Sequence, residues 1–576
     1  MFQYISKHYH RLSEKQKGGL AIFAICLFAF LLLLPQLISG GSIAGSDFLF
    51  HYNRFYETAE QIKTGNFSYF ISLYGFNGSA RIVNALYGPY FAYLQGAILL
   101  LSKTWYTYQL VSRFLIASLA GLSMYRLLRF IPVKRRTSLA IALLFMTTFS
   151  IQYWTFRQGF NSWGAAFMPW CLIPAIDFLK TGRVKIIRLA VAVAIMTQVH
   201  MLSTLMLVLM YIPFYLYGFI KSQHKLEVFL KGTAAALLCL LLTANVWLAI
   251  LQVGSGNELV QPFINSKLYI MTVNQRSIEW LITPYPLVVI VLYVLYFSFR
   301  HWRHYDKLLR TATTAFFIFL VLSTSIFPWY QVNKLKLNLV NLIQFPFRFF
   351  IPTTVLLLLV LALIIERYLD VKYSKWVAAT LLAVNIIGFA QISYRSTLKL
   401  WDYHNAAPIK NATHQFVLGS DSDIRKSFHS QDLSRLLSLA IKSTPDYLPA
   451  QKGNKENKYV LYEYYVLSND NHFEESQKGD KLTVTWTGDK AGRVSLPITK
   501  YKDTQLILNG QKLTEFDYTQ TGIGTISVNQ KVGKNTLVVS YRVSWFKYVL
   551  IGNVLAWLAT LATWLYLGRF KQKKQI

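Results

Sequence analysis

The feature that most constrains this chain is a series of near-continuous apolar stretches, the first of which begins near residue 18. Several of them are long enough, as helices, to cross a bilayer core of roughly 30 Å. Hydrophobic residues make up 54% of the 576 residues, charged residues make up only 15%, and the mean hydropathy is positive. These values exclude a cytosolic enzyme, a secreted repeat protein and a disordered chain.

We therefore predict an α-helical polytopic membrane protein with about twelve transmembrane helices and additional interfacial helices. A basic N-terminus, residues 1–17, precedes a transmembrane region at 18–394, and a last helix with a basic tail occupies 546–576. The predicted spans are 18–38, 110–130, 137–152, 163–179, 185–200, 201–220, 229–251, 285–300, 309–327, 350–366, 376–394 and 546–567. The first is longer than a signal-peptide core and no small-residue cleavage site follows it, which indicates a retained anchor.

The distribution of basic residues sets the predicted topology. If the apolar segment 89–101 lies flat at the outer surface, the short cytoplasmic pieces are dense in Lys and Arg. The short outer loops are longer in total and yet carry far fewer of these residues, in agreement with the positive-inside rule. Counting 89–101 as a span would place nearly every later basic loop outside. We thus expect both termini in the cytoplasm, an interfacial helix at 89–101, and no nucleic-acid partner despite a net charge of +33.

Two large outer regions are predicted, a first loop at 39–106 and a C-terminal region at 395–545. The second region begins with a polar stretch, 401–457, which carries one amphipathic helical pattern at 424–442. From about 458 it contains short alternating runs, such as KYVLYEYYVLS and KLTVTWTG, separated by NG and GD turns. This pattern predicts an extracytoplasmic β-sandwich. A passive cap and a glycan-contacting module are both compatible with it.

The most informative polar group follows the first span, in the sequence GSDFLFHYNRF. Asp47, His51 and Arg54 are spaced i, i+4 and i+7, which places them on one face of a helix. Such a helix could lie on the bilayer with its aromatic side chains down and these polar groups facing a cavity. The alternative is that Asp47 only caps the helix, with His51 and Arg54 as solvated neighbours.

Further polar candidates lie at the predicted outer mouths of the spans: Arg81, Tyr87 within LYGPY, Arg157, His200 and Arg348 within QFPFRFF. Each has a simple alternative, because aromatic residues anchor at interfaces, a lone His is commonly structural, and Arg can snorkel. Together, one carboxylate and several cations at one membrane face suit an anionic lipid phosphate. The carboxylate could remove a proton from an attacking sugar hydroxyl.

The arrangement of a single span, an outer loop opening with an acid, a second interfacial segment and a basic turn resembles the GT-C superfamily of integral-membrane glycosyltransferases. More narrowly, GSDFLFHYNRF, LYGPY and QFPFRFF resemble bacterial membrane proteins labelled "6-pyruvoyl-tetrahydropterin synthase-related", near the YfhO-like group. The resemblance covers roughly 18–394 and, more loosely, the β-rich region.

The resemblance implies an inverting sugar transfer on the outer face of the cell membrane, from a polyprenyl-phosphate sugar donor to a cell-envelope glycan acceptor. Asp47 would be the catalytic base. Arg348, with Arg157, Arg81 or Arg54, would bind the lipid phosphate, and His51, Tyr87 and His200 complete the predicted substrate-binding set. A flippase for lipid-linked glycans and a non-catalytic envelope-assembly protein remain alternatives.

Metal dependence is left open by the sequence. Many members of the superfamily carry a paired acidic motif for a divalent cation such as Mg²⁺ or Mn²⁺, and no DxD or ExD motif follows Asp47. Glu57 and Glu60 are the other acids of the first loop, and the three cysteines lie singly in apolar runs, without zinc-site spacing. We therefore assign no metal ligands and no certain cofactor.

Overall fold

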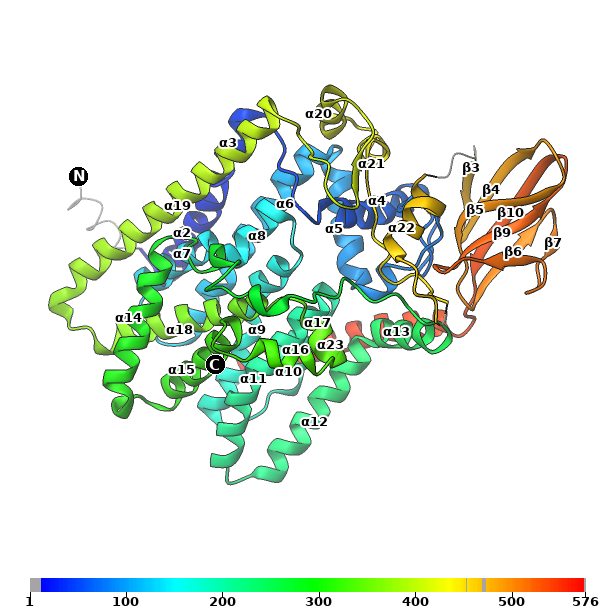
Figure 1. Cartoon of the computed structure of the whole chain (residues 1–576). Helices are drawn as coiled ribbons and strands as arrows, with labels where there is room; N and C mark the ends of the chain where they lie inside the picture. Colours follow the sequence, from blue (N-terminus) through cyan, green and yellow to red (C-terminus); the bar gives the residue numbers. More distant parts are fainter. Residues whose placement is uncertain (1–11, 452, 469–472, 574–576) are drawn as a thin grey trace.

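The computed structural model describes residues 12–451, 453–468 and 473–573. Helices account for 64% of the structure, and the strands gather at one end of the molecule, so the mostly helical fold with a C-terminal β region is confirmed (Figure 1). The helices up to residue 256 are α2 (Glu14–Leu31), α3 (Leu34–Ser39), α4 (Phe48–Thr64), α5 (Pro89–Ser102), α6 (Trp105–Phe130), α7 (Arg135–Thr147), α8 (Phe149–Arg157), α9 (Asn161–Thr181), α10 (Ile186–Val199), α11 (Met201–Lys221), α12 (Lys225–Leu242) and α13 (Ala244–Gly256).

The second half of the chain adds further helices before and around the β region. These are α14 (Pro286–His301), α15 (Lys307–Ser323), α16 (Trp329–Lys334), α17 (Asn338–Ile343), α18 (Phe350–Tyr368), α19 (Ser374–Asn405), α20 (Asp421–His429), α21 (Ser434–Leu439), α22 (Lys458–Tyr462) and α23 (Phe546–Lys573). Short 3₁₀ turns are η1 (Asn84–Leu86), η2 (Leu268–Ile270), η3 (Ile278–Trp280), η4 (Trp302–His304), η5 (Pro346–Phe349) and η6 (Val371–Tyr373), and η7 (Glu463–Leu467) is a π-helix.

Eight helical segments of the described chain are long and apolar enough to cross a membrane, or nine if the bent pair α12–α13 counts as one span. They are Glu14–Ser39, Trp105–Phe130, Arg135–Arg157, Asn161–Thr181, Met201–Lys221, Pro346–Tyr368, Ser374–Asn405 and Phe546–Leu567. They indicate a membrane protein, but the count is lower than the twelve spans predicted. Helices do form at the other predicted ranges. However, α10 has 14 residues, or about 21 Å of length, and α14 and α15 have 16 and 17.

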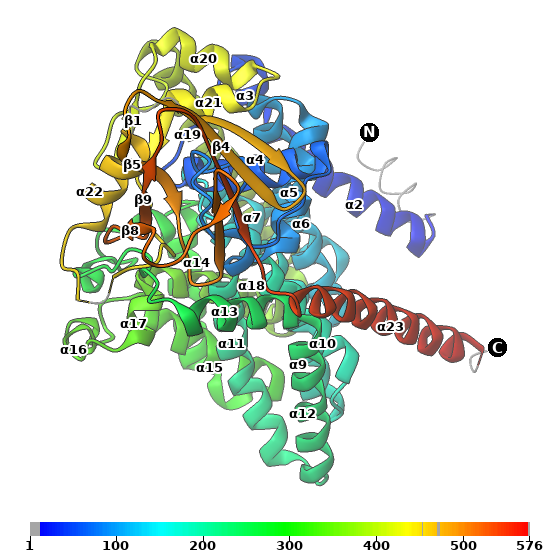
Figure 2. The same ribbon diagram turned by 90° about the vertical axis from the view of Figure 1, so that its right-hand side faces the viewer.

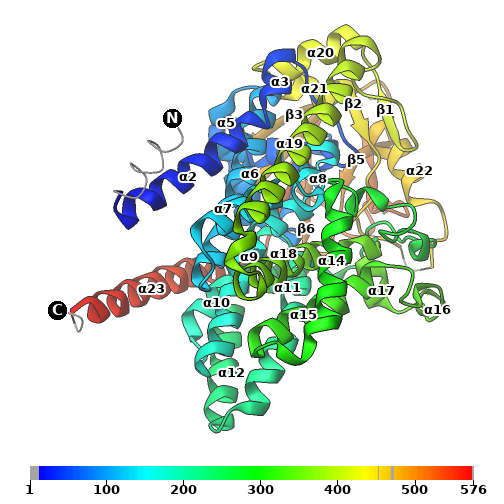
Figure 3. The same cartoon turned by 90° about the vertical axis from the view of Figure 1, so that its left-hand side faces the viewer.

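The spans differ in how much of their surface the protein covers. Helix α18 is central, because every residue from Phe350 to Ile364 is buried and the helix packs against α15, α7, α14 and α9. In contrast, α2 and α23 extend from the body on the same side of the molecule (Figures 2 and 3). Only 11% of the apolar window of α23 is buried. An apolar helix left uncovered in this way is suited to contact with lipid.

The strands between residues 474 and 541 form two antiparallel sheets. One has the order β3 (Glu474–Lys478), β4 (Lys481–Gly488), β10 (Gly533–Tyr541), β6 (Thr504–Leu508), β7 (Gln511–Lys512), and the other has β5 (Gly492–Thr499), β9 (Thr525–Gln530), β8 (Tyr518–Gln520). Alternate residues of both sheets, among them Val484, Leu496, Ile526 and Leu537, share one buried core. This core makes the pair of sheets a sandwich.

Two sequence predictions in this region are wrong in detail. The run KYVLYEYYVLS was expected to begin the sandwich, but residues 458–467 are helical and the first strand of the sandwich is β3. The amphipathic pattern at 424–442 was expected to form one helix. It is instead divided into α20, α21 and the short strand β2 (Ala440–Lys442), which pairs with β1 (Gln415–Val417).

The first loop and the sandwich pack as one body. Phe70, Leu73 and Ile82 of the loop are buried in the same apolar cluster as the inner faces of the strands. The backbone N–H of Thr499 donates to the carbonyl of Ser79, and other loop–sandwich hydrogen bonds accompany it. Figure 2 shows the strands in front of α4 and α5. The sandwich is therefore fixed on the first loop, 39–106, which carries Asp47.

Candidate active site

The segment that leads from α3 to Asp47 is held by side-chain amides. Gln109 bonds both backbone groups of Ile43, accepting from its N–H at 3.0 Å and donating to its carbonyl at 3.1 Å. The Gln158 side chain accepts from the N–H of Gly45 at 2.6 Å and donates to the carbonyl of Ile43 at 3.1 Å. These paired bonds satisfy the backbone of an irregular segment and fix its course up to residue 47.

Asp47 lies at the N-terminus of α4, at the cap position, but its side chain makes no capping hydrogen bond. Its backbone N–H donates to the carbonyl of Arg157, which ties it to the end of α8. The carboxylate is 4.0 Å from the Lys442 ammonium, which donates to the carbonyl of Ser46. Because the expected capping bond is absent, the carboxylate does not act as the cap of α4.

Opposing effects act on the Asp47 carboxyl. Burial raises its pKa, whereas the positive charges of Lys442, Arg348 and Arg157 lower it. The side chain is still 42% exposed, and this access to water limits how far burial can raise the pKa. Asp47 is thus a carboxylate that solvent can reach and that three cations surround. Two of these cations, Arg157 and Arg348, were predicted.

Arg348 lies in η5 with its guanidinium partly paired. Its Nη1 donates to the carbonyl of Ile343 at 2.9 Å and to Oε1 of Gln344 at 2.7 Å. Its Nε is buried and has no hydrogen-bond partner. Its charge lowers the pKa of both Asp47 and Tyr87, so motifs from opposite ends of the predicted transmembrane region meet at one place.

His51 and Arg54 are buried, so the alternative that made them solvated neighbours is wrong. The Arg54 guanidinium donates to Oδ1 of Asn84 at 3.0 Å and to the carbonyl of Tyr87 at 2.7 Å, and it lies 3.2 Å from Nδ1 of His51. Burial, and then the charge of Arg54, lower the pKa of His51, so the imidazole is neutral. Three neutral partners and the Tyr87 ring, at 4.3 Å, make Arg54 a clamp for the first loop.

The aromatic face of α4 does not point down into a bilayer, as one hypothesis had it. Phe48, Tyr52 and Phe55 are each buried inside the protein. The Tyr52 ring stacks on Trp105 of α6 with centroids 4.1 Å apart. Helix α4 is covered by α5, α21 and β2, and the buried side chains of His51 and Arg54 therefore adjoin protein.

His200 and Tyr87 lie side by side next to this clamp, with ring centroids 5.8 Å apart. The imidazole caps α11, because Nδ1 of His200 accepts the backbone N–H of Ser203 at 3.2 Å. Gly88 has a φ of 74°, and a side chain there would meet the carbonyl of Gln198. The simple structural explanation accounts for His200, whereas the Tyr87 ring lies against the Arg54 guanidinium and the Arg348 charge lowers the pKa of its hydroxyl.

Arg81 and Arg157 have different surroundings. Arg81 is fully buried and donates to the carbonyl of Asp446 at 2.5 Å and to the hydroxyl of Tyr462 at 3.3 Å. It therefore holds the segment before the sandwich and does not line the space around Asp47. Arg157 has a side chain that is 50% exposed, and it lies 4.0 Å from Glu279. It can move toward a ligand without losing a buried contact.

Two residues of the site were missed by sequence reasoning, Lys442 and Asp446. Lys442 ends the short strand β2, in a stretch predicted as one helix, and nothing in its own sequence links it to residue 47. Burial raises the pKa of Asp446 to about 6, while Arg81 and Lys442 lower it and the Asp47 carboxylate raises it. The charges of Asp47 and Lys442 therefore both influence this second carboxyl.

The other acids of the first loop are already engaged. The buried carboxylate of Glu57 accepts the backbone N–H groups of Leu73, Tyr74 and Gly75 at 2.7–2.8 Å. Glu60 pairs with Lys63 at 3.1 Å. Within the described ranges, no three His, Cys, Asp or Glu side chains gather as metal ligands would.

Comparison with known proteins identifies no family, because no family model matches this chain and no curated protein matches it. The site must therefore be interpreted from its geometry. That geometry brings Asp47, Arg157 and Arg348 together with Lys442. It places His51, Arg54, Tyr87 and His200 in a supporting layer and Arg81 apart from both. A solvent-accessible carboxylate among cations can take a proton beside a bound anion.

Proposed function

We propose that this protein is a GT-C-type glycosyltransferase, which transfers one sugar from a polyprenyl-phosphate carrier, such as undecaprenyl phosphate, to an extracytoplasmic cell-envelope acceptor. Wall glycan, teichoic acid and exopolysaccharide are the acceptor classes that fit. The observation that supports this most directly is the position of Asp47, half exposed and surrounded by Lys442, Arg157 and Arg348. The membrane-spanning helices supply the setting that a lipid-linked donor requires.

In this mechanism, the Asp47 carboxylate takes the proton of an acceptor hydroxyl. The hydroxyl oxygen forms a bond to the anomeric carbon of the sugar as the bond from that carbon to the lipid phosphate breaks. The electron pair of the breaking bond leaves with the phosphate, which Arg348, Lys442 and Arg157 stabilise. The direct displacement inverts the anomeric configuration.

One observation keeps movement of a lipid-linked glycan as a second candidate. Arg113 is a buried cation within the span Trp105–Phe130, and it donates to Oε1 of Gln36 at 2.5 Å. Charge at membrane depth is characteristic of transport pathways. Here the network of Arg113 and Gln36 continues to Gln109, which holds the segment before Asp47, and this connection favours the enzyme.

The first prediction is that Asp47→Asn abolishes transfer. Purified full-length protein in liposomes would be incubated with radiolabelled undecaprenyl-phosphate sugars and envelope acceptors. Loss of a general base should lower the rate by a factor of about 10²–10⁴. Asp421→Asn, at an exposed site in α20, is the matched control and should keep full activity. Full transfer by the Asp47 variant would refute the proposed base. Movement of the lipid-linked sugar across the liposome membrane, without any transfer by the wild type, would favour the transporter.

A further inference from the structure

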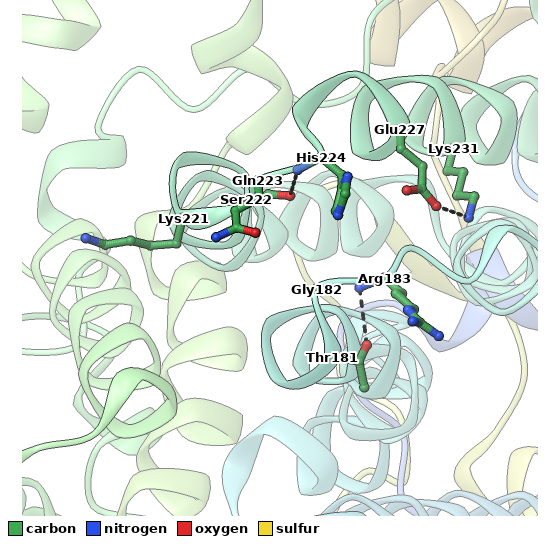
Figure 4. Close-up of a pocket in the computed structure, with 9 residues that line it drawn as sticks. All are labelled: Thr181, Gly182, Arg183, Lys221, Ser222, Gln223, His224, Glu227 and Lys231. Atoms are coloured by element: carbon green, nitrogen blue, oxygen red, sulfur yellow. Dashed lines mark hydrogen bonds and ion pairs between the residues drawn. The ribbon is translucent and has the colours of Figure 1, made fainter.

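A polar cavity lies far from Asp47 in sequence, between two helical turns. It has a volume of about 540 Å³ and is lined by the turn from α9 to α10 and by the turn from α11 to α12 (Figure 4). Both turns belong to basic pieces, 180–188 and 221–231, that the charge distribution predicts to be cytoplasmic. The proposed sugar transfer does not use this cavity.

The charges that line the cavity do not balance. Arg183, Lys221 and Lys231 contribute three cations, and Glu227 is the carboxylate among the lining residues. Glu227 is paired with Lys231 at 2.5 Å. Within the described part of the chain, no carboxylate pairs with Arg183 or Lys221. In Figure 4, His224 extends from one turn toward the turn that carries Arg183, whereas Lys221 extends away from both. The cavity therefore has an excess of positive charge, with Arg183 as its main available cation.

The helices beside the cavity carry uncovered apolar side chains. On α12, Leu226 and Phe229 are 70% and 55% exposed, within one turn of Glu227. On α11, Ile220 is 65% exposed and directly precedes Lys221. An apolar surface that continues into a basic cavity matches a molecule with an anionic head and a hydrocarbon tail.

We propose that this cavity binds the phosphate headgroup of an anionic phospholipid from the cytoplasmic leaflet, with its acyl chains along α11 and α12. A guanidinium at Arg183 can hold a phosphate through two parallel N–H donors. Glu227 competes with the headgroup for Lys231, because their ion pair must loosen before the ammonium can turn to the phosphate. The apolar flanks favour a lipid over free phosphate as the source of the anion.

The test measures lipid retention by the detergent-solubilised full-length protein, by native mass spectrometry, after addition of phosphatidylglycerol or phosphatidylcholine. Wild type should retain phosphatidylglycerol preferentially. Arg183→Gln should lower this retention about fivefold, as expected for removing one basic residue near an anionic surface. Glu227→Gln should raise it, because Lys231 is released. Lys375→Gln, another exposed charge change on a predicted cytoplasmic piece, is the control and should leave retention unchanged.

The Lys375→Gln control makes the same charge change as Arg183→Gln outside the cavity, so the comparison of these two variants distinguishes a specific site from general attraction to charge. Equal retention of the two lipids, unchanged retention in Arg183→Gln, or no gain in Glu227→Gln would each overturn the proposal. The last measurement is a competition between inorganic phosphate and the bound phosphatidylglycerol. Displacement of phosphatidylglycerol by inorganic phosphate alone would identify a soluble anion as the ligand and refute the lipid, whereas continued retention supports it.

Discussion

At the residue scale, the chemistry of the site depends on the balance of burial and charge at Asp47. Burial raises the pKa of its carboxyl, and Lys442 is the strongest of the cations that lower it. A general base must be deprotonated to act, so activity is present above this pKa and is lost as the pH falls through it. The neighbouring cations therefore keep the base active at lower pH than burial alone would allow.

This balance predicts the effect of Lys442→Met. The Lys442 ammonium lowers the pKa of Asp47, and burial raises it. Without the ammonium the pKa of Asp47 therefore rises, and the acid limb of the pH–rate profile moves to higher pH. Lys442→Arg should restore the profile, because it restores the charge. Lys426→Met, at an exposed position in α20, should leave the acid limb in place. An acid limb that stays in place or moves to lower pH in Lys442→Met would contradict the role of Lys442.

Sequence reasoning selected Asp47, Arg157 and Arg348 because charges at the ends of apolar spans are costly and so conspicuous. It predicted that His51 and Arg54 share one face of a helix, and their side chains lie 3.2 Å apart on α4. It could not tell that Asn84 and Tyr87 fold back over them, because helical spacing defines a face but not what covers it. Lys442 was missed for the same reason, since only tertiary folding brings β2 to residue 47.

At the element scale, the shape of the first loop depends on Glu57 of α4. This buried carboxylate accepts three consecutive backbone N–H groups, from Leu73 to Gly75, and also bonds Gln61 at 2.6 Å. Burial raises the pKa of Glu57, and the backbone hydrogen bonds lower it. This single side chain therefore holds residues 73–75 of the loop against α4.

Glu57→Gln should therefore destabilise the protein. The amide keeps one acceptor oxygen but introduces an NH₂ group toward backbone N–H donors, which leaves buried donors unsatisfied. We expect a loss of about 1.5–3 kcal/mol, the range for hydrogen bonds to a charged group. Thermal unfolding in detergent measures it. Glu60→Gln, one turn away and paired with Lys63, whose side chain is 62% exposed, should change the stability by less than about 1 kcal/mol. Equal effects of the two substitutions would contradict the role of Glu57 in holding the loop.

The misassigned run at 458–467 illustrates the limit of pattern reading at this scale. Aromatic and β-branched residues favoured a strand. However, Tyr462 and Val466, spaced i and i+4, are the residues that are buried, together with Leu448 and Ile523. That spacing is helical, and it was present in the sequence. A run this short fits both the two-residue period of a strand and the 3.6-residue period of a helix. The residues that pack against it therefore decide which structure forms.

At the scale of the whole molecule, the β-sandwich belongs to the same unit as the first loop. Their shared core and hydrogen bonds mean that the loop carrying the candidate base cannot move independently of the strands. The sequence predicted both parts separately. It could not predict that the two parts pack together. They lie toward opposite ends of the chain, and the sequence of neither part indicates its partner. This union favours an active role of the sandwich over a passive cap.

Tyr501 is the residue at which this union can be tested. Its buried hydroxyl accepts the N–H of Ile82 at 3.0 Å and donates to the carbonyl of Tyr447 at 3.1 Å. Tyr501→Phe leaves two buried backbone groups without that partner, at a cost of about 2 kcal/mol. Tyr464→Phe, at a side chain that is 70% exposed, is the matched control.

Hydrogen exchange followed by mass spectrometry measures where that cost appears. If the loop and the sandwich unfold as one cooperative unit, Tyr501→Phe should accelerate exchange in both 68–86 and 474–541 by a similar factor, about 30-fold for about 2 kcal/mol. The same experiment on Tyr464→Phe should give wild-type rates. Faster exchange confined to the loop, with the strands unchanged, would show two independent units.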